Sequence, residues 1–148
     1  AVCCETLRIY PVAMLTFRRA IQSPVSLRGY ELEPGVGVMG SIYNLHQNKN
    51  LYPEPKKFKP ERFLEKQFSP YEFMPFGGGT RRCIGMAFAQ FEMKLILAKI
   101  LSGLDLNLVT NGEVKPKRRG VVTSPSRPIE MVVKAKQAVH SHSLETVS

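Results

Sequence analysis

The 148-residue sequence contains no tryptophan and only three cysteines. Cys3 and Cys4 are adjacent, which makes a bond between them unfavourable, and no C-x-x-C spacing occurs. This cysteine usage argues against a disulfide framework or a zinc site and fits a reducing compartment. The histidines His46, His140 and His142 are too scattered to form a metal-binding set.

Targeting and membrane signals are also missing. The first residues, AVCCETLRIYP, carry no basic leader and no initiating Met, and they begin in the middle of a helical pattern. No apolar run approaches the length needed to span a bilayer. We therefore expect a chain that is truncated at its start, a cytoplasmic location and no membrane segment in this stretch. A membrane anchor in a preceding stretch stays open.

Acidic side chains are scarce. The 12 Asp and Glu face 21 Lys and Arg, so the net charge is +9 and the pI is near 9.7. The basic residues gather in three runs, which are Lys56, Lys57 and Lys59, then Arg81 and Arg82, then Lys115, Lys117, Arg118 and Arg119. Such runs attract nucleic acid, acidic lipid or acidic proteins, but most are solvated surface.

The third cysteine, Cys83, lies in the stretch FGGGTRRCIG, residues 76–85, of the form F-x-x-G-x-R-x-C-x-G. Five fixed positions at this spacing occur by chance on the order of 10⁻⁵ times in a chain of this length. A lone cysteine is more often a small core residue, and a glycine-rich turn before a helix can instead bind phosphate. The phosphate reading lacks the Lys-Ser/Thr pair of a P-loop.

The residue types around Cys83 suit a thiolate ligand. A cysteine at a helix N-terminus faces unpaired backbone N–H groups, which favour the anion that binds metals. We expect Gly79 and Gly85 to allow a sharp turn that a Cβ would forbid, and Phe76 to shield the sulfur. Arg81 carries a fork of donors suited to a carboxylate.

The helix after Cys83 is predicted over residues 84–101, with Gly103 as its C-cap. Its sequence, IGMAFAQFEMKLILAKIL, is apolar around most of its circumference, so it needs neighbours on several sides. The turns, short strands and proline-rich stretch elsewhere in the chain cannot easily supply them. Burial of this helix therefore requires protein beyond this sequence.

The cysteine stretch resembles the haem-ligand loop of the cytochrome P450 monooxygenases. Two further motifs stand in the family's order, E-x-x-R at Glu5 and Arg8, and P-E-R-F at residues 60–63. The match runs from about Val2 to Lys134. The sequence of residues 68–101 looks most like that of soluble bacterial, particularly cyanobacterial, members. E-x-x-R alone would be a weak signal, because it is usually a surface ion pair.

The resemblance implies a haem b cofactor and a role for each matching residue. Cys83 would be the axial ligand of the haem iron, and Arg81 and Arg18 would bind its propionates, although an exposed strand arginine is the alternative for Arg18. Glu5, Arg8 and Arg62 would form a buried structural cluster. Further cofactor contacts are implied for Phe76 and Gly85. A substrate pocket is implied for Val12, Ala13, Met14 and Val121, for which ordinary core packing is the alternative.

The implied fold is mainly α with small β-sheets (α+β). It runs from the family's K helix through the cysteine loop and the L helix to terminal β-hairpins. The pattern predicts a helix over residues 2–10, strands over 14–21, 25–32 and 36–41, and one or two helical turns from Ser41. An ordered coil follows, and two later strands cover 104–109 and 129–134 with a turn at Asn111-Gly112. Residues 1–135 form one domain part, and the polar tail 136–148 is predicted to be disordered.

The implied activity is insertion of one oxygen atom of dioxygen into an apolar organic substrate. Two electrons would come from an acidic ferredoxin or flavoprotein reductase docked on the basic surface near Arg82, so we favour an acidic protein over nucleic acid as partner. The family's I helix, with its acid-alcohol pair, precedes the first matching residue, so the chain as written is expected not to catalyse. Two alternatives stay open. One is a haem-thiolate enzyme that needs no external electrons, and the other is a non-enzymatic basic binding fragment.

Overall fold

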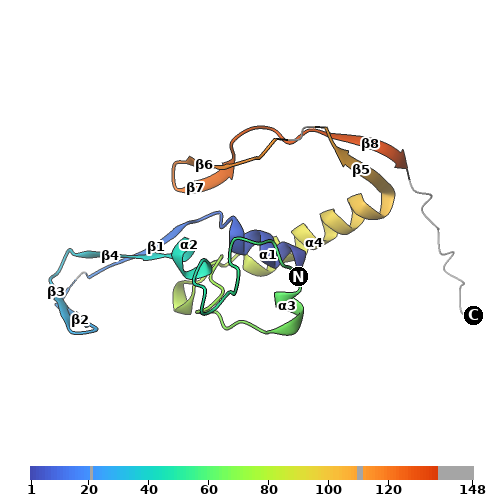
Figure 1. Ribbon diagram of the computed structural model, residues 1–148. Coiled ribbons are helices and arrows are strands. Elements are labelled where there is room, and N and C mark those ends of the chain that lie inside the picture. Colours follow the sequence, from blue (N-terminus) through green and yellow to red (C-terminus); the bar gives the residue numbers. More distant parts are fainter. Residues whose placement is uncertain (21, 110–111, 137–148) are drawn as a thin grey trace, which may run out of the picture. The chain divides into compact units, whose positions relative to one another are not determined.

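The computed structural model describes residues 1–20, 22–109 and 112–136. The chain divides into two compact units. The first contains Ala1–Met86 with Pro116–Ser124, and the second contains Ala87–Lys115 with the residues from Pro125 onward. Figure 1 shows helices joined by short two-stranded pairs.

The first unit begins with helix α1, Val2–Ile9. The Tyr10 N–H still donates to the Thr6 carbonyl, and Pro11 then ends the helix because it has no N–H to donate. The predicted helix over residues 2–10 is thus confirmed, with Tyr10 as its C-cap. The buried side of α1 carries Glu5, Leu7 and Arg8.

Strand β1, Leu15–Arg19, pairs antiparallel with β4, Gly37–Ser41. β1 is shorter than the predicted strand 14–21, whose last residue, Ile21, lies outside the described residues. Between these strands, β2, Val25–Leu27, and β3, Tyr30–Leu32, form a hairpin. Its two-residue turn places Arg28 at φ 49° and Gly29 at φ 85°, the positive values that a tight hairpin turn requires.

Helix α2, Ile42–His46, follows β4 directly, as predicted. Its first turn is capped because the Ser41 hydroxyl accepts a hydrogen bond of 3.1 Å from the Asn44 N–H. Residues 47–61 then run without helix or strand, as the ordered coil predicted. The short helix α3, Arg62–Glu65, and the 3₁₀ turn η1, Gly79–Arg81, were not predicted.

Strands β6, Pro116–Arg119, and β7, Val122–Pro125, pair with each other, which the sequence pattern did not indicate. Gly120 at φ 63° allows the turn between them. The Thr123 N–H donates to the Val12 carbonyl over 2.8 Å, and Ala13 bridges to Val122. These bonds attach the β6–β7 pair to the residues after α1.

The second unit holds most of helix α4, Met86–Gly103, and the antiparallel pair of β5, Leu104–Leu108, and β8, Met131–Lys136. The helix starts two residues later than predicted and includes Gly103 instead of ending before it. β8 also lies two residues further along than predicted, so Lys136 belongs to a strand. Asn111 and residues 137–148 lie outside the described residues, and the tail stays a prediction.

Helices and strands take comparable lengths of the described chain. The expected small β-sheets are confirmed, but this stretch is a mixture of helices and small antiparallel sheets and is not mainly α. Because each strand has a single partner, the sheets supply little apolar cover.

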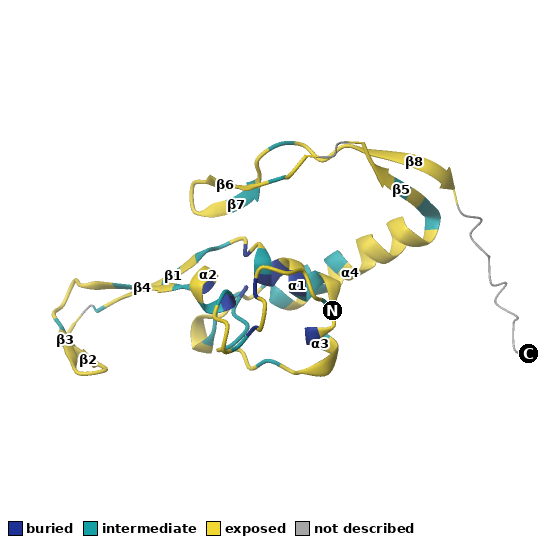
Figure 2. Cartoon of the chain, in the orientation of Figure 1, coloured by how far each residue is buried: buried dark blue, intermediate teal, exposed yellow. Residues whose placement is uncertain are grey.

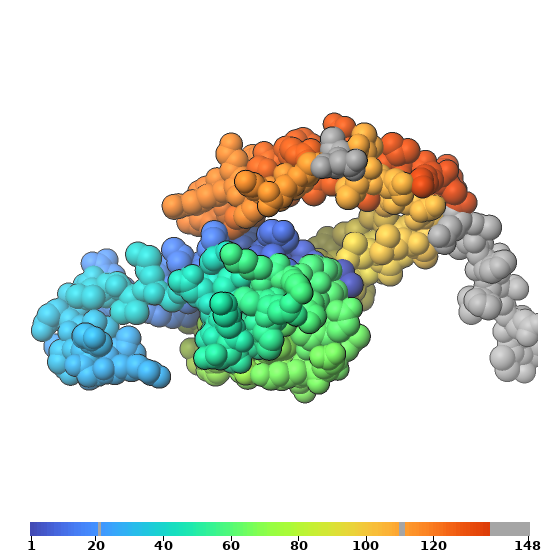
Figure 3. Space-filling model, in the orientation of Figure 1, coloured from blue at the N-terminus to red at the C-terminus, as the bar shows by residue number. Residues whose placement is uncertain are grey.

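The buried core is small and lies in the first unit (Figure 2). Its core apolar residues are Leu7, Ile42 and Tyr52, and four polar or charged residues are buried with them, Glu5, Arg8, His46 and Arg62. In Figure 3 the coil and the segment after it, coloured teal to green, pack into one continuous mass. No residue of α4 is buried, and Phe88, Phe91 and Leu101 are each more than half exposed.

This exposure agrees with the expectation that α4 needs further protein around it.

The described residues contain no helix with the length and apolarity to cross a membrane.

The cap of α2 provides a first test. Ser41→Ala removes the acceptor for the Asn44 N–H and should lower the free energy of unfolding by about 1 kcal/mol, measured by urea denaturation. Ser41→Thr keeps a hydroxyl and serves as the control. An alanine variant as stable as the native chain would show that the cap contributes nothing.

Candidate functional site

A buried ion cluster joins α1 to α3. The Glu5 carboxylate accepts two hydrogen bonds of 2.8 Å from the Arg8 guanidinium and one of 3.2 Å from Arg62 Nε. Glu5 and Arg8 are 0% exposed, and Arg62 is 9% exposed. The structure therefore brings the three predicted cluster residues together, although Arg62 lies more than fifty positions after the other two in the sequence.

The cluster also fastens the coil between α2 and α3. Arg8 donates to the carbonyls of His46 over 2.7 Å and Pro55 over 2.8 Å. The Lys59 N–H donates to Glu5 over 2.9 Å. One carboxylate with two guanidinium groups thus replaces regular secondary structure as the support of this stretch.

The pKa of Glu5 lies below its ordinary value of 4.5. Burial alone would raise the pKa, but it is outweighed by the hydrogen bonds from Arg8 and Lys59 and by the charges of Arg8 and Arg62. Glu5 is therefore an anion at neutral pH, and the cluster carries one net positive charge.

Aromatic residues surround the cluster, and sequence reasoning missed them. The Arg8 guanidinium lies 5.0 Å from the centre of the Tyr52 ring, and Tyr52 stacks on Phe68 at 4.8 Å. Burial raises the pKa of Tyr52, whose hydroxyl donates to the Glu72 carbonyl over 2.8 Å. The spacing of aromatic residues around P-E-R-F could have indicated that aromatic side chains pack around the cluster.

His46 was also missed, because the histidines were considered only as a metal-binding set. Its side chain is fully buried and hydrogen-bonds to α1 and to the segment before the cysteine loop. A histidine next to an apolar helical turn was the available signal.

The loop that carries Cys83 turns back on itself. The Cys83 N–H donates to the Phe76 carbonyl over 2.9 Å, which closes a loop that contains η1. Gly77 at φ 77° and Gly79 at φ 67° take backbone conformations that favour glycine. Cys83 itself is exposed, so its sulfur is available to a ligand.

Two expectations about this loop need correction. Helix α4 begins at Met86, so Cys83 lies three residues before its first residue instead of directly before it, and the Cys83 carbonyl accepts from the Met86 N–H over 3.3 Å. Gly85 does not have a positive φ, and a Cβ there would lie 3.8 Å from Cys83 Sγ, an ordinary contact. Nothing within the described chain requires glycine at this position.

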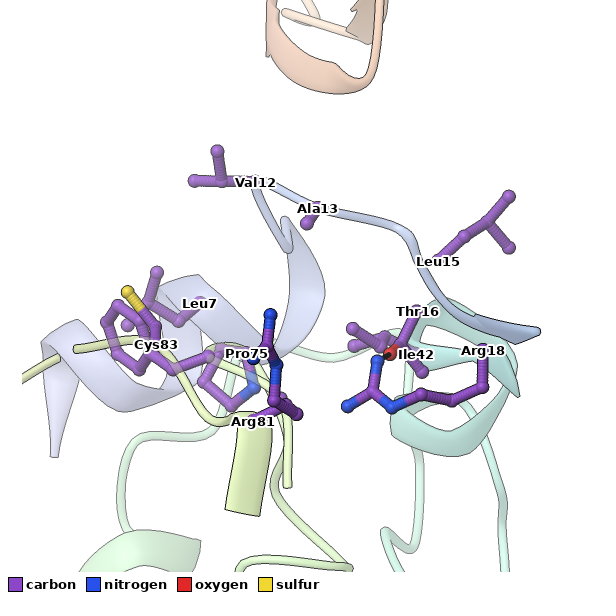
Figure 4. Close-up of a pocket in the computed structure, with 12 residues that line it drawn as sticks. Leu7, Val12, Ala13, Leu15, Thr16, Arg18, Ile42, Pro75, Arg81 and Cys83 are labelled. Atoms are coloured by element: carbon purple, nitrogen blue, oxygen red, sulfur yellow. Dashed lines mark hydrogen bonds between the residues drawn. The ribbon is translucent and has the colours of Figure 1, made fainter. Parts of the chain in front are cut away.

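A pocket of about 430 Å³ lies beside the loop, entirely within the first unit. It is lined by Leu7, Val12, Ala13, Leu15, Thr16, Arg18, Ile42, Pro75, Phe76, Gly77, Arg81 and Cys83. Figure 4 shows the guanidinium groups of Arg18 and Arg81 directed into the same open space. The structure thus gathers Cys83, Phe76, both arginines, Val12 and Ala13, but the lining does not include Met14, Gly85 or Val121.

The two arginines of the pocket lack carboxylate partners among the described residues. Arg18 donates only to its own strand, to the Phe17 carbonyl over 2.7 Å and the Thr16 hydroxyl over 3.5 Å. Arg81 makes no ion pair in the described part of the chain. A thiol, two such cations and apolar walls fit a large apolar ligand with acidic groups and a metal that takes sulfur.

Comparison with known proteins defines the class. The family model described as Cytochrome P450 matches residues 1–133. The chain therefore belongs to the cytochrome P450 family, as its three motifs indicated, and the family is one of haem enzymes.

Individual relatives are similar over nearly the whole chain. "Putative cytochrome P450 135B1" of Mycobacterium tuberculosis is 38% identical over 146 residues, which are 99% of this chain and 31% of that protein. "Cytochrome P450 3A40" of Oryzias latipes is 39% identical over 142 residues, 93% of this chain and 28% of that protein. A solved structure, "Retinoic acid bound cyanobacterial CYP120A1", is 30% identical with a TM-score of 0.76, and the match covers 89% of this chain and 31% of that one.

The chain spans about a third of the length of these relatives. Within that span the chain has part of the P450 fold. Its relatives include bacterial and cyanobacterial members, as expected from the sequence of residues 68–101.

The ion cluster provides a second test. Glu5→Gln leaves two buried guanidinium groups without a counter-charge and should lower the free energy of unfolding by about 3–5 kcal/mol at pH 7. Glu54→Gln removes only exposed ion pairs, those with Lys57 and Lys59, so it should have a much smaller effect.

The same variant tests the pH dependence of the cluster. Because the pKa of Glu5 is lowered by folding, its contribution is fully present above pH 4.5 and is lost as the pH falls through the folded value. Unfolding measured from pH 7 to pH 3 should show a shallower loss of stability on the acid side in Glu5→Gln than in the native chain. Equal slopes would contradict the assignment.

Proposed function

We propose that this chain forms the thiolate side of the haem site of a cytochrome P450 monooxygenase. One observation carries the proposal: a single pocket combines the exposed Cys83 sulfur with two arginines that have no carboxylate partner in the described chain. Cys83 would hold the iron of haem b, and Arg18 and Arg81 would hold its propionates. When bound, the haem supplies the activation of dioxygen and the insertion of one oxygen atom into the substrate.

The chain's own residues position the cofactor and exclude water. The bond from the Cys83 N–H to the Phe76 carbonyl holds the sulfur in place, and the Phe76 side chain lines the pocket beside it. Arg18 lies on β1 and Arg81 in η1, so the two propionate contacts come from separate elements. Both elements belong to the unit that the Glu5–Arg8–Arg62 cluster stabilises.

The substrate is proposed to be an apolar organic molecule. Val12, Ala13 and Leu15 form an apolar wall of the pocket, and the bridge between Ala13 and Val122 attaches the β6–β7 pair to this wall. Met14 and Val121 are kept as candidates next to the wall, although neither lines the pocket. Retinoic acid, named with the cyanobacterial relative, belongs to the same broad chemical class.

Electrons are proposed to come from an acidic ferredoxin or flavoprotein reductase. The net charge of +9 favours an acidic partner, and Arg82 is exposed next to the cysteine loop. Activity requires the remaining two thirds of the family fold together with this chain, since the relatives are about three times as long.

The ligand assignment is tested by comparing two cysteines in the protein that contains this chain at its natural length. Cys83→Ser should abolish the red-shifted Soret band of a thiolate-ligated, reduced carbon-monoxide complex. Cys3→Ser should leave that band unchanged, because Cys3 lies on α1 away from the pocket lining. If the two variants gave the same spectrum, Cys83 would not be the ligand.

The neighbouring arginines allow a matched test of the propionate contact. Arg81→Leu should weaken haem binding about 10- to 100-fold, since a hydrogen bond to a charged group contributes about 1.5–3 kcal/mol. Arg82→Leu carries the same charge change but does not line the pocket, so it should alter association with the acidic partner and not haem affinity. Haem titration and partner-binding measurements separate the two effects, and equal haem affinities in the two variants would contradict the role of Arg81.

A further inference from the structure

The His46 ring bridges α1 and the segment that enters the cysteine loop. Its Nδ1 lies 3.2 Å from the Arg8 carbonyl, and its Nε2 accepts a 2.9 Å hydrogen bond from the Met74 N–H. The His46 carbonyl in turn accepts from Arg8 Nη1 over 2.7 Å. His46 is 0% exposed, so water cannot replace these bonds.

These partners determine the protonation state of the ring. A backbone N–H can only donate, so Nε2 must offer its lone pair to Met74. Nδ1 must then carry the proton and donate it to the Arg8 carbonyl, which can only accept. Both bonds exist together only in the neutral imidazole with its proton on Nδ1.

Met74 begins the loop that presents Cys83. Its carbonyl accepts from the Gly77 N–H over 3.0 Å, and the Phe76 carbonyl accepts from the Cys83 N–H over 2.9 Å. A Cβ built on Gly78 would lie 3.2 Å from the Met74 side chain, which shows how closely Met74 packs on the loop. His46 therefore holds the loop at its first residue, Met74, and Met74 is linked through Gly77 and Phe76 to Cys83.

We propose that His46 is a positioning residue that fastens the Cys83 loop to the buried Glu5–Arg8–Arg62 cluster, and that protonation of its ring releases the loop. This role of His46 lies outside the haem site. Only the predicted effect on thiolate ligation rests on the proposed function. His46 does not touch the cofactor pocket, since it is not among the residues that line it.

The surroundings of the ring oppose its protonation. Burial comes first and lowers the pKa of His46 to about 4, while the hydrogen bond to the Arg8 carbonyl acts in the opposite direction and the Arg8 charge lowers it further. The charged and titratable groups beside the ring are Arg8 on α1 and Tyr52 in the coil, and Arg8 is in turn bound to Glu5, which also accepts from Arg62 on α3. Phe73 stacks on the ring at 5.6 Å and excludes water from that side.

Protonation would make both ring nitrogens donors, so Nε2 would face the Met74 N–H without an acceptor. The folded pKa is below the ordinary value of 6.5, so the stabilisation is complete above pH 6.5 and decreases as the pH falls toward 4. The attachment of the loop is thus intact at neutral pH and is lost in acid.

Two amide substitutions separate the bonds of the ring. In His46→Asn the side-chain amide N–H occupies the place of Nδ1 and keeps the bond to Arg8, but Met74 loses its acceptor. In His46→Gln the side-chain oxygen occupies the place of Nε2 and keeps the acceptor for Met74, but Arg8 loses its donor. Neither amide titrates, so both variants should lose the pH step.

The first measurement is hydrogen exchange of the Met74 amide in the apo protein. Exchange should be about tenfold faster in His46→Asn than in His46→Gln, because only the asparagine variant lacks the acceptor. Equal exchange rates in the two variants would overturn the proposal. This measurement needs no haem, so it is independent of the proposed function.

The second measurement is the fraction of thiolate-ligated carbon-monoxide spectrum from pH 7 to pH 4 in the haem-loaded protein. The native protein should lose this fraction as the pH approaches 4, whereas His46→Gln should keep it. A native protein with the thiolate spectrum but without this difference from His46→Gln would overturn the proposal. Absence of the thiolate spectrum at every pH would reject the proposed function alone, and the exchange result would still decide the role of His46.

A third measurement uses the native protein and does not depend on the folding of either variant. Ring-nitrogen chemical shifts of His46, followed by NMR, should show the Nδ1–H tautomer at neutral pH and proton uptake only near pH 4. Protection of the Met74 amide should decrease with the same midpoint. Proton uptake near pH 6.5, or protection that does not follow it, would overturn the proposal.

Discussion

The structure of the first unit depends on one buried carboxylate held by two guanidinium groups. Glu5 cannot lose either partner without leaving a charge buried, and Arg8 is also bound to the carbonyls of His46 and Pro55. Since the coil between α2 and α3 has no helix or strand of its own, these bonds determine its path. Arg62 still has one buried nitrogen, Nη2, without a partner in the described chain, so the cluster is not fully satisfied.

The cluster and the cysteine loop have different roles in the site: the cluster supports the fold, and the loop presents groups to a ligand. The cluster is buried and nearly all of its polar atoms have partners, whereas the loop presents an exposed thiol and exposed arginines to a ligand. His46 and Met74 connect the two regions through a single buried ring. Helix α4 follows the loop with an apolar surface that nothing in the described chain buries, which fits a stretch that covers about a third of its relatives' length.

Much of this arrangement was predictable where local sequence decides the structure. Pro11 ends α1, and Ser41 caps α2 at the predicted place. The coil after α2 was also expected to be ordered, but only because the motifs on both sides resemble a known family. The boundaries of α4 and β8 were each predicted two residues too early, since the apolar patterns begin before the true starts and stop before the true ends. The β6–β7 pair was missed because its strand β6 consists of one proline and three basic residues, which carry no alternating apolar pattern.

The sequence by itself determined the family, because its motifs have fixed spacings and residue types. The same motifs indicated Cys83 and Arg81 as candidate site residues and Glu5, Arg8 and Arg62 as a candidate cluster. Only the tertiary structure decided which of them meet. It brought Arg18 from β1 and Arg81 from η1 into one pocket, excluded Met14, Gly85 and Val121 from its lining, and buried His46 and Tyr52 beside the cluster. These contacts join residues far apart in the chain, so no local sequence pattern indicates them. The polar groups of His46 and Tyr52 can be buried because the fold supplies their hydrogen-bond partners.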